Sequence, residues 1–228
     1  MIEGVKKAVM FCAHTDDEMV AAGTLHRLAR NGCEVHVVAY GPAAITGDRQ
    51  GSHPSARVVL EEWHRSLDVI GVGHEPNVAP HGPAPPSGYR HYLGYVPSSK
   101  LDDYKQGIAD FAFKLVEHVK PDAVFTLSPD DENPAHSVVG TQTERVLRGR
   151  VPLTIRCNYS WNYTVGRPNL FVRLDPEDVA AKRAVINCYQ SQLWRYKYED
   201  LMLAAAVTDG LSVKVSYAEK FEIIRSVV

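Results

Sequence analysis

The sequence predicts an α/β fold in which a mostly parallel sheet is covered by helices on both faces. Short apolar runs, which are typical of buried strands, alternate along the chain with longer segments whose apolar residues recur every three or four positions. Glycine, proline and asparagine stand between many of these segments, where turns are expected. This alternation favours β-α-β units over an all-helical or all-strand architecture.

The first two elements have clear local signals. Lys7–Cys12 is mostly apolar and is expected to be a buried strand. A helix is expected over 18–30, because its apolar residues share one face. Thr15 and Glu18 have the spacing of a capping box, which predicts that the helix begins at Asp16.

The remaining elements follow from the same criteria. Strands are expected at 35–40, 123–127, 153–158 and 170–174, helices at 55–70, 102–119, 136–147, 175–190 and 199–207, and a closing segment at 217–224. The helix at 55–70 has apolar residues at spacings of three and four. Asp175 and Pro176 predict a helix start, because a capping residue is followed by proline at the first helical position.

Residues 71–99 break this alternation. Prolines, glycines and tyrosines are frequent there, and no apolar period survives. A loop of this length inside a compact domain is usually a lid, a binding loop or a contact between subunits. The chain has 228 residues, which suffices for one domain with a sizeable core. We therefore expect a single domain over 1–228 that contains this loop, and a homo-oligomer built on the loop is one arrangement that fits.

Composition excludes several classes of partner. The net charge is −2 and the basic residues are scattered, so neither nucleic acid nor an anionic membrane is expected to bind. The N-terminal apolar stretch is too short for a secretory signal, and no run is long enough to span a membrane. The four cysteines form no Cys-x-x-Cys pair, which favours a reducing cytoplasm. A dinucleotide enzyme is disfavoured, because no Gly-x-Gly-x-x-Gly motif follows the first strand.

The most informative segment is Ala-His-Thr-Asp-Asp-Glu at 13–18, directly after the first strand. It places a histidine and three carboxylates where a strand is expected to turn into a helix. His14 and Asp17 are three positions apart, so both can point to one spot and bind one cation. Asp16 lies beside that spot and is suited to be the general base for a metal-bound water. The alternative is that the carboxylates only stabilise the positive end of a helix, which leaves His14 unexplained.

His136 is the best candidate for a third ligand, since a catalytic metal usually takes three from the protein. It follows the expected strand 123–127 at a helix start, in an acidic loop that contains Asp130 and Asp131. Ligands bind at the carboxyl ends of parallel strands, so this loop and 13–18 are expected to meet. Otherwise His136 is a polar residue at a helix start. Two imidazoles and one carboxylate suit zinc with an open position for water, and they also suit non-haem iron(II).

These motifs resemble those of the PIG-L/LmbE-like deacetylases, which are zinc-dependent N-acetyl-sugar deacetylases with a Rossmann-like fold. The family's Ala-His-Pro-Asp-Asp-Glu corresponds to 13–18, and its His-Pro-Asp-His corresponds to Asn-Pro-Ala-His at 133–136. Weaker likenesses are Arg57 with Glu61 or Glu62, Ile70-Gly71-Val72, Lys182-Arg183-Ala184, Tyr189-x-Ser191-Gln192 and Tyr217-Ala-Glu-Lys-Phe221. The likeness runs in order over nearly the whole chain.

The resemblance implies a hydrolase that removes an N-acetyl group from an amino sugar or glycoside by means of a metal-activated water. It implies that His14, Asp17 and His136 bind the metal ion and that Asp16 is the general base. The expected cofactor is Zn²⁺, with Fe²⁺ as the alternative, and the expected substrate is a small N-acetylated amino sugar. Aromatic residues of the 71–99 loop, together with Trp161 or Tyr163, are candidates for stacking on a sugar face, with ordinary packing as the alternative.

Two further site residues follow from the resemblance. Asn133 stands where the family has a histidine that helps stabilise the oxyanion, and an amide can donate a hydrogen bond but cannot deliver a proton. Arg57 is the candidate for substrate contact, with a surface ion pair as its alternative. Thr15 replaces the family's proline, and Ala135 replaces an aspartate that orients its neighbours, a role that Asp130 or Asp131 could take over.

Two other functions fit parts of the pattern. A non-haem iron oxygenase uses two histidines and one carboxylate, but its commonest form is an all-β jelly roll, whereas this chain alternates strand with helix. A Rossmann-like binding protein that has lost catalysis would explain the changes at Asn133 and Ala135. Metal content separates these cases, since the binding protein needs no stoichiometric metal.

Overall fold

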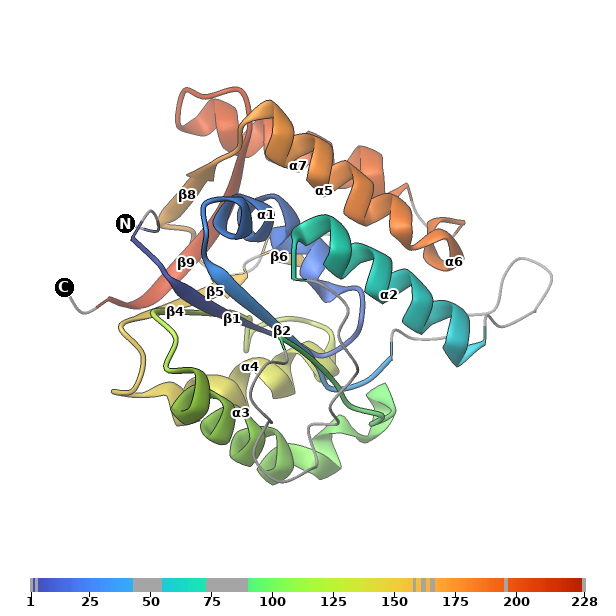
Figure 1. Ribbon diagram of the computed structural model, residues 1–228, viewed down its shortest axis with the longest axis vertical. Helices are drawn as coiled ribbons and strands as arrows, with labels where there is room; N and C mark the ends of the chain where they lie inside the picture. The colour runs from blue at the N-terminus through green and yellow to red at the C-terminus, as the bar shows by residue number, and fades with distance from the viewer. Residues whose placement is uncertain are drawn as a thin grey trace.

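The computed structural model of the chain describes residues 2, 4–42, 55–72, 90–157, 159–160, 163–164, 167–194 and 197–226. The described residues form a sheet of seven strands in the order β3-β2-β1-β4-β5-β9-β8, and β6 and β7 form a separate small hairpin. Helices cover both faces of the large sheet (Figure 1). Within these described ranges, no helix is both long and apolar enough to cross a membrane.

The strands and helices alternate along most of the chain. The strands are β1 (Lys7–Cys12), β2 (Glu34–Ala39), β3 (His91–Leu93), β4 (Ala123–Leu127), β5 (Leu153–Cys157), β6 (Tyr159–Ser160), β7 (Tyr163–Thr164), β8 (Leu170–Arg173) and β9 (Ala218–Ser226). The α-helices are α1 (Ala22–Arg30), α2 (Ala56–Ile70), α3 (Lys105–Val119), α4 (Pro134–Leu147), α5 (Pro176–Cys188), α6 (Gln190–Leu193) and α7 (Tyr198–Ser212). Two 3₁₀ helices are η1 (Asp17–Ala21) and η2 (Ser98–Tyr104).

The sheet is mostly parallel, as the sequence predicts. β1 lies at the centre of the five parallel strands and pairs with β2 and with β4, while β3 and β5 extend this parallel part on either side. The chain then returns through β9, which runs antiparallel to both β5 and β8. The carboxyl ends of β1, β2 and β4 therefore lie at one edge, which is where parallel α/β sheets bind ligands.

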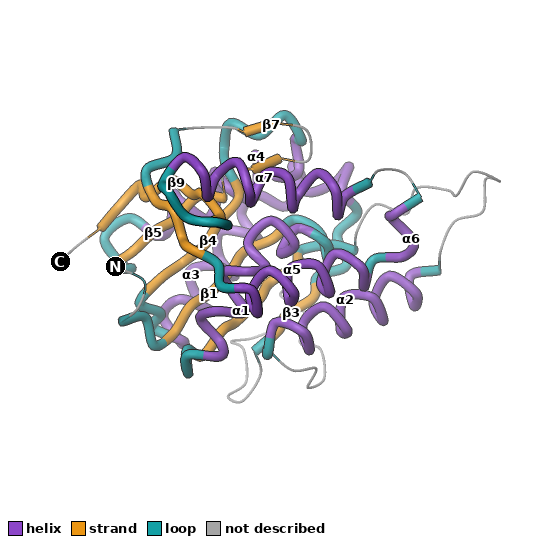
Figure 2. Tube along the Cα trace, turned by 90° about the horizontal axis from the view of Figure 1, so that it is seen from above, coloured by secondary structure: helices purple, strands orange, loops and turns teal. Residues whose placement is uncertain are grey.

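β1 explains why the sheet is buried on both faces. Met10 and Cys12 face a core formed with α1, α2, α5 and α7, whereas Val9 and Phe11 face a second core formed with α3 and α4. All four side chains are fully buried. Figure 2 views the molecule from the side of α1, α2, α5 and α7, and α3 lies behind the sheet. Alternate side chains of one apolar strand thus pack against both helical layers.

The predicted start of the first helix is wrong. The chain makes the 3₁₀ helix η1 before α1 begins, and the Asp16 side chain accepts no capping hydrogen bond. The Glu18 carboxylate accepts hydrogen bonds from the hydroxyls of Ser66 and Tyr189, which come from distant segments of the chain. Burial raises the pKa of Glu18 to about 8, although these two hydrogen bonds oppose the shift.

The region 71–99 also differs in part from the prediction of a loop. Residues 73–89 lie outside the described residues, but 91–93 form the strand β3, which pairs in parallel with β2 at the edge of the sheet. The helix expected at 102–119 begins as η2 and becomes α-helical only at Lys105. The other predicted strands and helices agree with the structure to within two residues at each end, except that α7 extends five residues beyond the expected end at 207. The expected closing segment is the strand β9, which extends two residues further than expected.

Candidate metal centre

The structure brings His14, Asp17 and His136 together at the carboxyl edge of the parallel strands. His14 follows β1, Asp17 opens η1, and His136 lies in the first turn of α4. Their candidate ligand atoms all lie within 4.8 Å of one another. Asp17 Oδ1 is 3.1 Å from His136 Nε2 and 3.6 Å from His14 Nδ1. All three side chains are buried.

Asp17 is held in place by its other carboxylate oxygen. The backbone N–H groups of Ala13 and His14 both donate hydrogen bonds to Asp17 Oδ2, each at 2.8 Å. The carboxylate thereby closes the turn that follows β1. Its second oxygen, Oδ1, is left to face the two imidazoles.

Two of the atoms that face one another are otherwise unsatisfied. Among the described residues, Asp17 Oδ1 and His136 Nε2 are buried and face each other as an ion pair at 3.1 Å, and neither atom has a hydrogen bond to any other group. Buried polar atoms without partners are unfavourable and rare in folded proteins. A cation bound between these atoms would satisfy them. Two imidazoles and one carboxylate fit zinc with one open position.

The charges in the metal-free protein are those of an ion pair. Burial opposes ionisation of Asp17, but His136 and His14 hold the pKa of its carboxyl well below the usual value. Burial likewise disfavours a charged His136, yet Asp17 and Asp131 together raise its pKa to about 10. A metal ion must therefore displace a proton from His136, and metal affinity is expected to rise with pH.

Asp16 lies next to the triad and has the properties of a base. Burial, and then the neighbouring Asp17 carboxylate, raise the pKa of Asp16 to about 6, while His14 and His136 oppose the shift. Such a carboxyl is ionised at neutral pH and still accepts a proton readily. Asp16 therefore stays the candidate for proton transfer, whereas the Asp17 carboxylate holds the turn.

Each imidazole also has a partner on its outer side. Asp131 Oδ2 lies 3.0 Å from His136 Nδ1, and Ser98 Oγ lies 3.0 Å from His14 Nε2. The sequence offered Asp131 only as one of two substitutes for the carboxylate missing at Ala135. Ser98 gave no sequence signal, because it lies at the end of the 71–99 region where no period could place it.

Asp131→Asn is expected to lower zinc affinity by about 10–100-fold, because partners of metal-bound histidines orient the ring and raise its basicity. In the wild-type chain, the backbone N–H of Asn133 donates a hydrogen bond to Asp131 Oδ1 at 2.8 Å. The side-chain oxygen of an asparagine at position 131 can accept the same hydrogen bond. Competition with a chelator measures the affinity. Asp130→Asn is the matched control, since Asp130 is exposed in the same loop. Equal affinities of the two variants would contradict the assignment.

Asn133 caps the helix that carries His136. Its Oδ1 accepts a hydrogen bond from the backbone N–H of Ala135 at 3.0 Å, and its side chain is half-buried. Asparagine is among the preferred residues at this position. The cap uses the oxygen of the amide, so Nδ2 remains a donor, and a role for Asn133 toward the oxyanion stays a prediction.

Arg57 takes the alternative role that the sequence allowed. Its guanidinium is exposed and donates to Glu61 one turn away, at 2.7 Å, in a surface ion pair on α2. A contact with substrate stays a prediction. Glu62, which follows Glu61 on α2, is buried and accepts hydrogen bonds from the backbone N–H and the hydroxyl of Ser191. These hydrogen bonds connect α2 to α6. Trp161 and the side chain of Tyr163 lie outside the described part of the chain.

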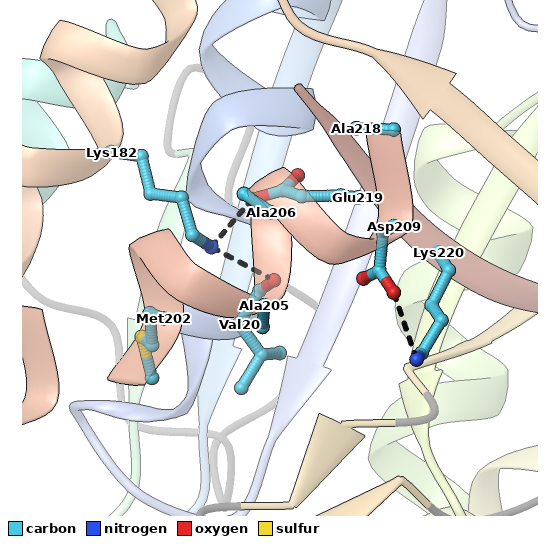
Figure 3. A pocket seen from close by; sticks show the side chains of 9 residues that line it. All are labelled: Val20, Lys182, Met202, Ala205, Ala206, Asp209, Ala218, Glu219 and Lys220. Carbon is cyan, nitrogen blue, oxygen red and sulfur yellow. Dashed lines mark hydrogen bonds and ion pairs between the residues drawn. The ribbon is translucent and has the colours of Figure 1, made fainter. Parts of the chain in front are cut away.

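A buried ion pair supports the segment that carries Asp17. Lys182 Nζ, on α5, donates hydrogen bonds to the carbonyl oxygens of Met19 and Val20 at 2.9 and 3.2 Å, and to Glu219 Oε1 at 2.6 Å. Figure 3 shows Lys182 between Glu219 and the carbonyl of Val20. The lysine thereby satisfies carbonyl groups at the end of η1.

Glu219 performs the complementary task at the start of α1. The backbone N–H groups of Gly23 and Thr24 donate hydrogen bonds to its carboxylate at 3.1 and 2.7 Å. Lys182 and Glu219 are only 3% and 4% exposed, so neither charge is solvated by bulk water. The pair joins α5 and β9 to the η1–α1 junction, a few residues beyond Asp17.

Lys182→Met is expected to lower the free energy of unfolding by about 3–5 kcal/mol, because it leaves Glu219 buried without its cation. Denaturant unfolding measures the change. Arg183→Met is the control on the same helix: Arg183 pairs with Glu199 in a well-exposed ion pair, for which a change of about 0–1 kcal/mol is expected. Glu219→Gln added to Lys182→Met is expected to recover part of the loss. If Lys182→Met were as stable as Arg183→Met, this account of the buried ion pair would be contradicted.

The family model for GlcNAc-PI de-N-acetylase (PIG-L) matches residues 9–147. This range contains all three residues of the triad and covers more than half of the chain. The chain belongs to this family. A comparison with curated protein sequences gives no match.

Solved structures with the same fold extend over nearly the whole chain. The conserved protein TT1542 from Thermus thermophilus is 18% identical, with a TM-score of 0.75 over 98% of this chain and 96% of that one. The N,N'-diacetylchitobiose deacetylase from Pyrococcus horikoshii is 21% identical, with a TM-score of 0.68 over 98% of this chain and 85% of that one. GalB, the 4-carboxy-2-hydroxymuconate hydratase from Pseudomonas putida KT2440, is 20% identical, with a TM-score of 0.68 over 98% of both chains. The Rossmann-like α/β fold is thereby confirmed, and the same fold serves two reaction types.

Proposed function

We propose that the protein is a metal-dependent hydrolase that removes an N-acetyl group from an amino sugar or glycoside. The observation that carries this proposal is the buried triad of His14, Asp17 and His136 with Asp16 beside it, inside a family whose model is named for a de-N-acetylase. The Pyrococcus horikoshii deacetylase supports an N-acetylated sugar as the substrate class. The hydratase with the same fold means that the fold alone does not select this reaction.

Zinc is the proposed metal, with iron(II) as the alternative, and His14 Nδ1, Asp17 Oδ1 and His136 Nε2 would hold it. A zinc ion there would supply Lewis acidity, which lowers the pKa of water toward about 7 and polarises the acetyl carbonyl. The described cysteines are unpaired, which supports the cytoplasm as the proposed location.

Two side chains of the protein would handle the proton and the developing charge. Asp16 accepts the proton of the attacking water and returns it to the leaving amine, so no covalent intermediate with the protein is needed. Asn133 Nδ2 donates a hydrogen bond to the carbonyl oxygen as it becomes an oxyanion. Removing one such donor typically costs about 10²–10³ in rate, so the retained amide matters.

The proposal is tested by incubating the purified protein, loaded with zinc or with iron(II), with a panel of N-acetylated amino sugars and glycosides. The expected result is release of acetate and a free amine from at least one of them. O-acetylated sugars and N-acetylated amino acids are the control substrates. Hydration of 4-carboxy-2-hydroxymuconate without any amide hydrolysis would instead place the protein with the hydratase, and would overturn the proposal.

A further inference from the structure

We propose that Ser98 is a positioning residue that fixes the orientation and tautomer of His14, so that Nδ1 presents its lone pair to the metal ion. The inference rests on the metal site of the proposed function. Ser98 Oγ lies 3.0 Å from His14 Nε2, on the side of the ring opposite to the atom that faces Asp17. Ser98 follows β3 by a few residues and opens η2.

The chemistry of imidazole makes this contact consequential. A neutral imidazole carries its proton on one nitrogen only, and the hydrogen bond made by the other nitrogen decides which one can bind a metal. With a metal ion bound, the serine hydroxyl would accept the N–H of Nε2 and leave the lone pair of Nδ1 for the ion. Nδ1 lies on the side of the ring that faces Asp17 Oδ1, at 3.6 Å. His14 is only 5% exposed, so bulk water does not offer an equivalent acceptor.

The backbone holds Ser98 at this position. The N–H of Gly94 donates to the carbonyl of Ala39, and the N–H of Val96 donates to that of Tyr40 at 3.1 Å, so this segment continues alongside the end of β2. The N–H of Gly41 donates to the carbonyl of Ala13 at 3.0 Å, next to His14. The segment thus connects Ser98 to the turn that carries the histidine.

Glycine at position 41 is what permits this approach. A Cβ atom there would lie 2.2 Å from the carbonyl oxygen of Val96, which is far closer than side chains tolerate. The close contact keeps the chain before Ser98 against the residues that follow β2. The hydroxyl therefore comes from a fixed backbone and does not depend on a mobile side chain alone.

The two outer partners differ in charge, which sets the expected size of the effect. The partner of His136 is the carboxyl group of Asp131, whereas the partner of His14 is the hydroxyl of Ser98. Charge-assisted hydrogen bonds are roughly twice as strong as neutral ones. Ser98→Ala is therefore expected to weaken zinc binding by about tenfold, at the lower end of the usual range for such partners.

The test measures zinc affinity by chelator competition for the wild-type chain and the variants Ser98→Ala, Ser98→Thr and Ser99→Ala. Ser99 is the matched control, because it is the adjacent serine and is exposed. We expect about tenfold weaker binding by Ser98→Ala, near wild-type binding by Ser98→Thr, and no change in Ser99→Ala. In NMR spectra of the zinc-loaded wild-type chain, the Nε2–H proton of His14 should exchange slowly, and it should exchange faster in Ser98→Ala.

The outcomes separate this inference from the proposed function. The metal site stands if the wild-type chain binds zinc and His136→Ala does not. The role of Ser98 is overturned if, in addition, Ser98→Ala binds zinc as tightly as Ser99→Ala and its Nε2–H signal is unchanged. If the wild-type chain binds no zinc at the triad, both are overturned. Thermal unfolding of each variant shows whether a loss of affinity is a loss of folding; a Ser98→Ala chain that binds weakly only because it unfolds also overturns the role of Ser98.

Discussion

Asp16→Asn is expected to reduce the rate of N-acetyl hydrolysis by about 10²–10⁴-fold, because it removes the general base and leaves the ligands in place. Asparagine has the shape of aspartate but cannot accept a proton from water. The main-chain role of residue 16 is unaffected, since its carbonyl oxygen accepts the N–H of Met19 whatever the side chain. The measurement is the turnover rate with saturating substrate, together with the zinc content of the same preparation.

The pH profile gives the same claim an independent test. The base is active when ionised, so the wild-type rate should be low in acid and rise with pH through the pKa of Asp16. That pKa is about 6 in the metal-free protein. A bound cation favours the ionised form and moves this limb to lower pH. Asp16→Asn should lose the acid limb. Asp130→Asn is the control, because Asp130 is exposed in the loop before α4, and this variant should keep the acid limb. A zinc-loaded Asp16→Asn chain with full activity would exclude Asp16 as the base.

His136→Ala is expected to abolish stoichiometric zinc binding and to reduce activity by at least about a thousandfold. The metal contributes several kcal/mol to the stabilisation of the transition state, and each 1.4 kcal/mol is about tenfold in rate. Only His14 and Asp17 would remain as ligands, and the negative charge of Asp17 would lose its close partner at 3.1 Å. Zinc per chain after dialysis is the measurement.

His118→Ala is the control for this variant, because His118 is exposed near the end of α3. It should keep both zinc and activity. Because burial of an unpaired Asp17 carboxylate can destabilise the fold, His136→Gln provides a second variant that retains a polar group. Retention of one tightly bound zinc per folded chain in both His136 variants would remove His136 from the metal site.

The sequence predicted the sheet and the triad for the same physical reason. β1 is apolar on both faces, so it had to lie inside a parallel sheet, and the carboxyl ends of its neighbours had to meet at one edge. His14 and His136 follow two such ends and are both buried in the structure. Local pattern and strand topology were enough to bring together residues from distant segments.

The predicted capping box shows why some local features of the structure could not be predicted from the sequence. Thr15 and Glu18 have the right spacing, but the Glu18 carboxylate is bonded by Ser66, which is 48 positions away, and by Tyr189, which is 171 positions away. Tertiary hydrogen bonds to a buried carboxylate overrode a local preference that is worth about 1 kcal/mol. The strand β3 was not predicted because a segment of three residues is too short to show a periodic pattern of apolar residues.

The outer partners of the histidines are long-range features of the same kind. Ser98 is 84 positions from His14, and only the pairing of β3 with β2 brings it there. Ala135 carries no carboxylate and is buried against the core around α3 and α4, and Asp131 lies beside His136. Sequence spacing named Asp131 as one candidate but could not select it over Asp130.

Anomalous diffraction at the zinc absorption edge, from crystals grown with equimolar zinc, tests the central claim most directly. The account predicts one strong peak between His14 Nδ1, Asp17 Oδ1 and His136 Nε2, about 2.0–2.2 Å from each atom, with a vacant or water-filled fourth position. A peak bound to other residues, or a well-ordered triad without any anomalous signal at full zinc loading, would contradict it.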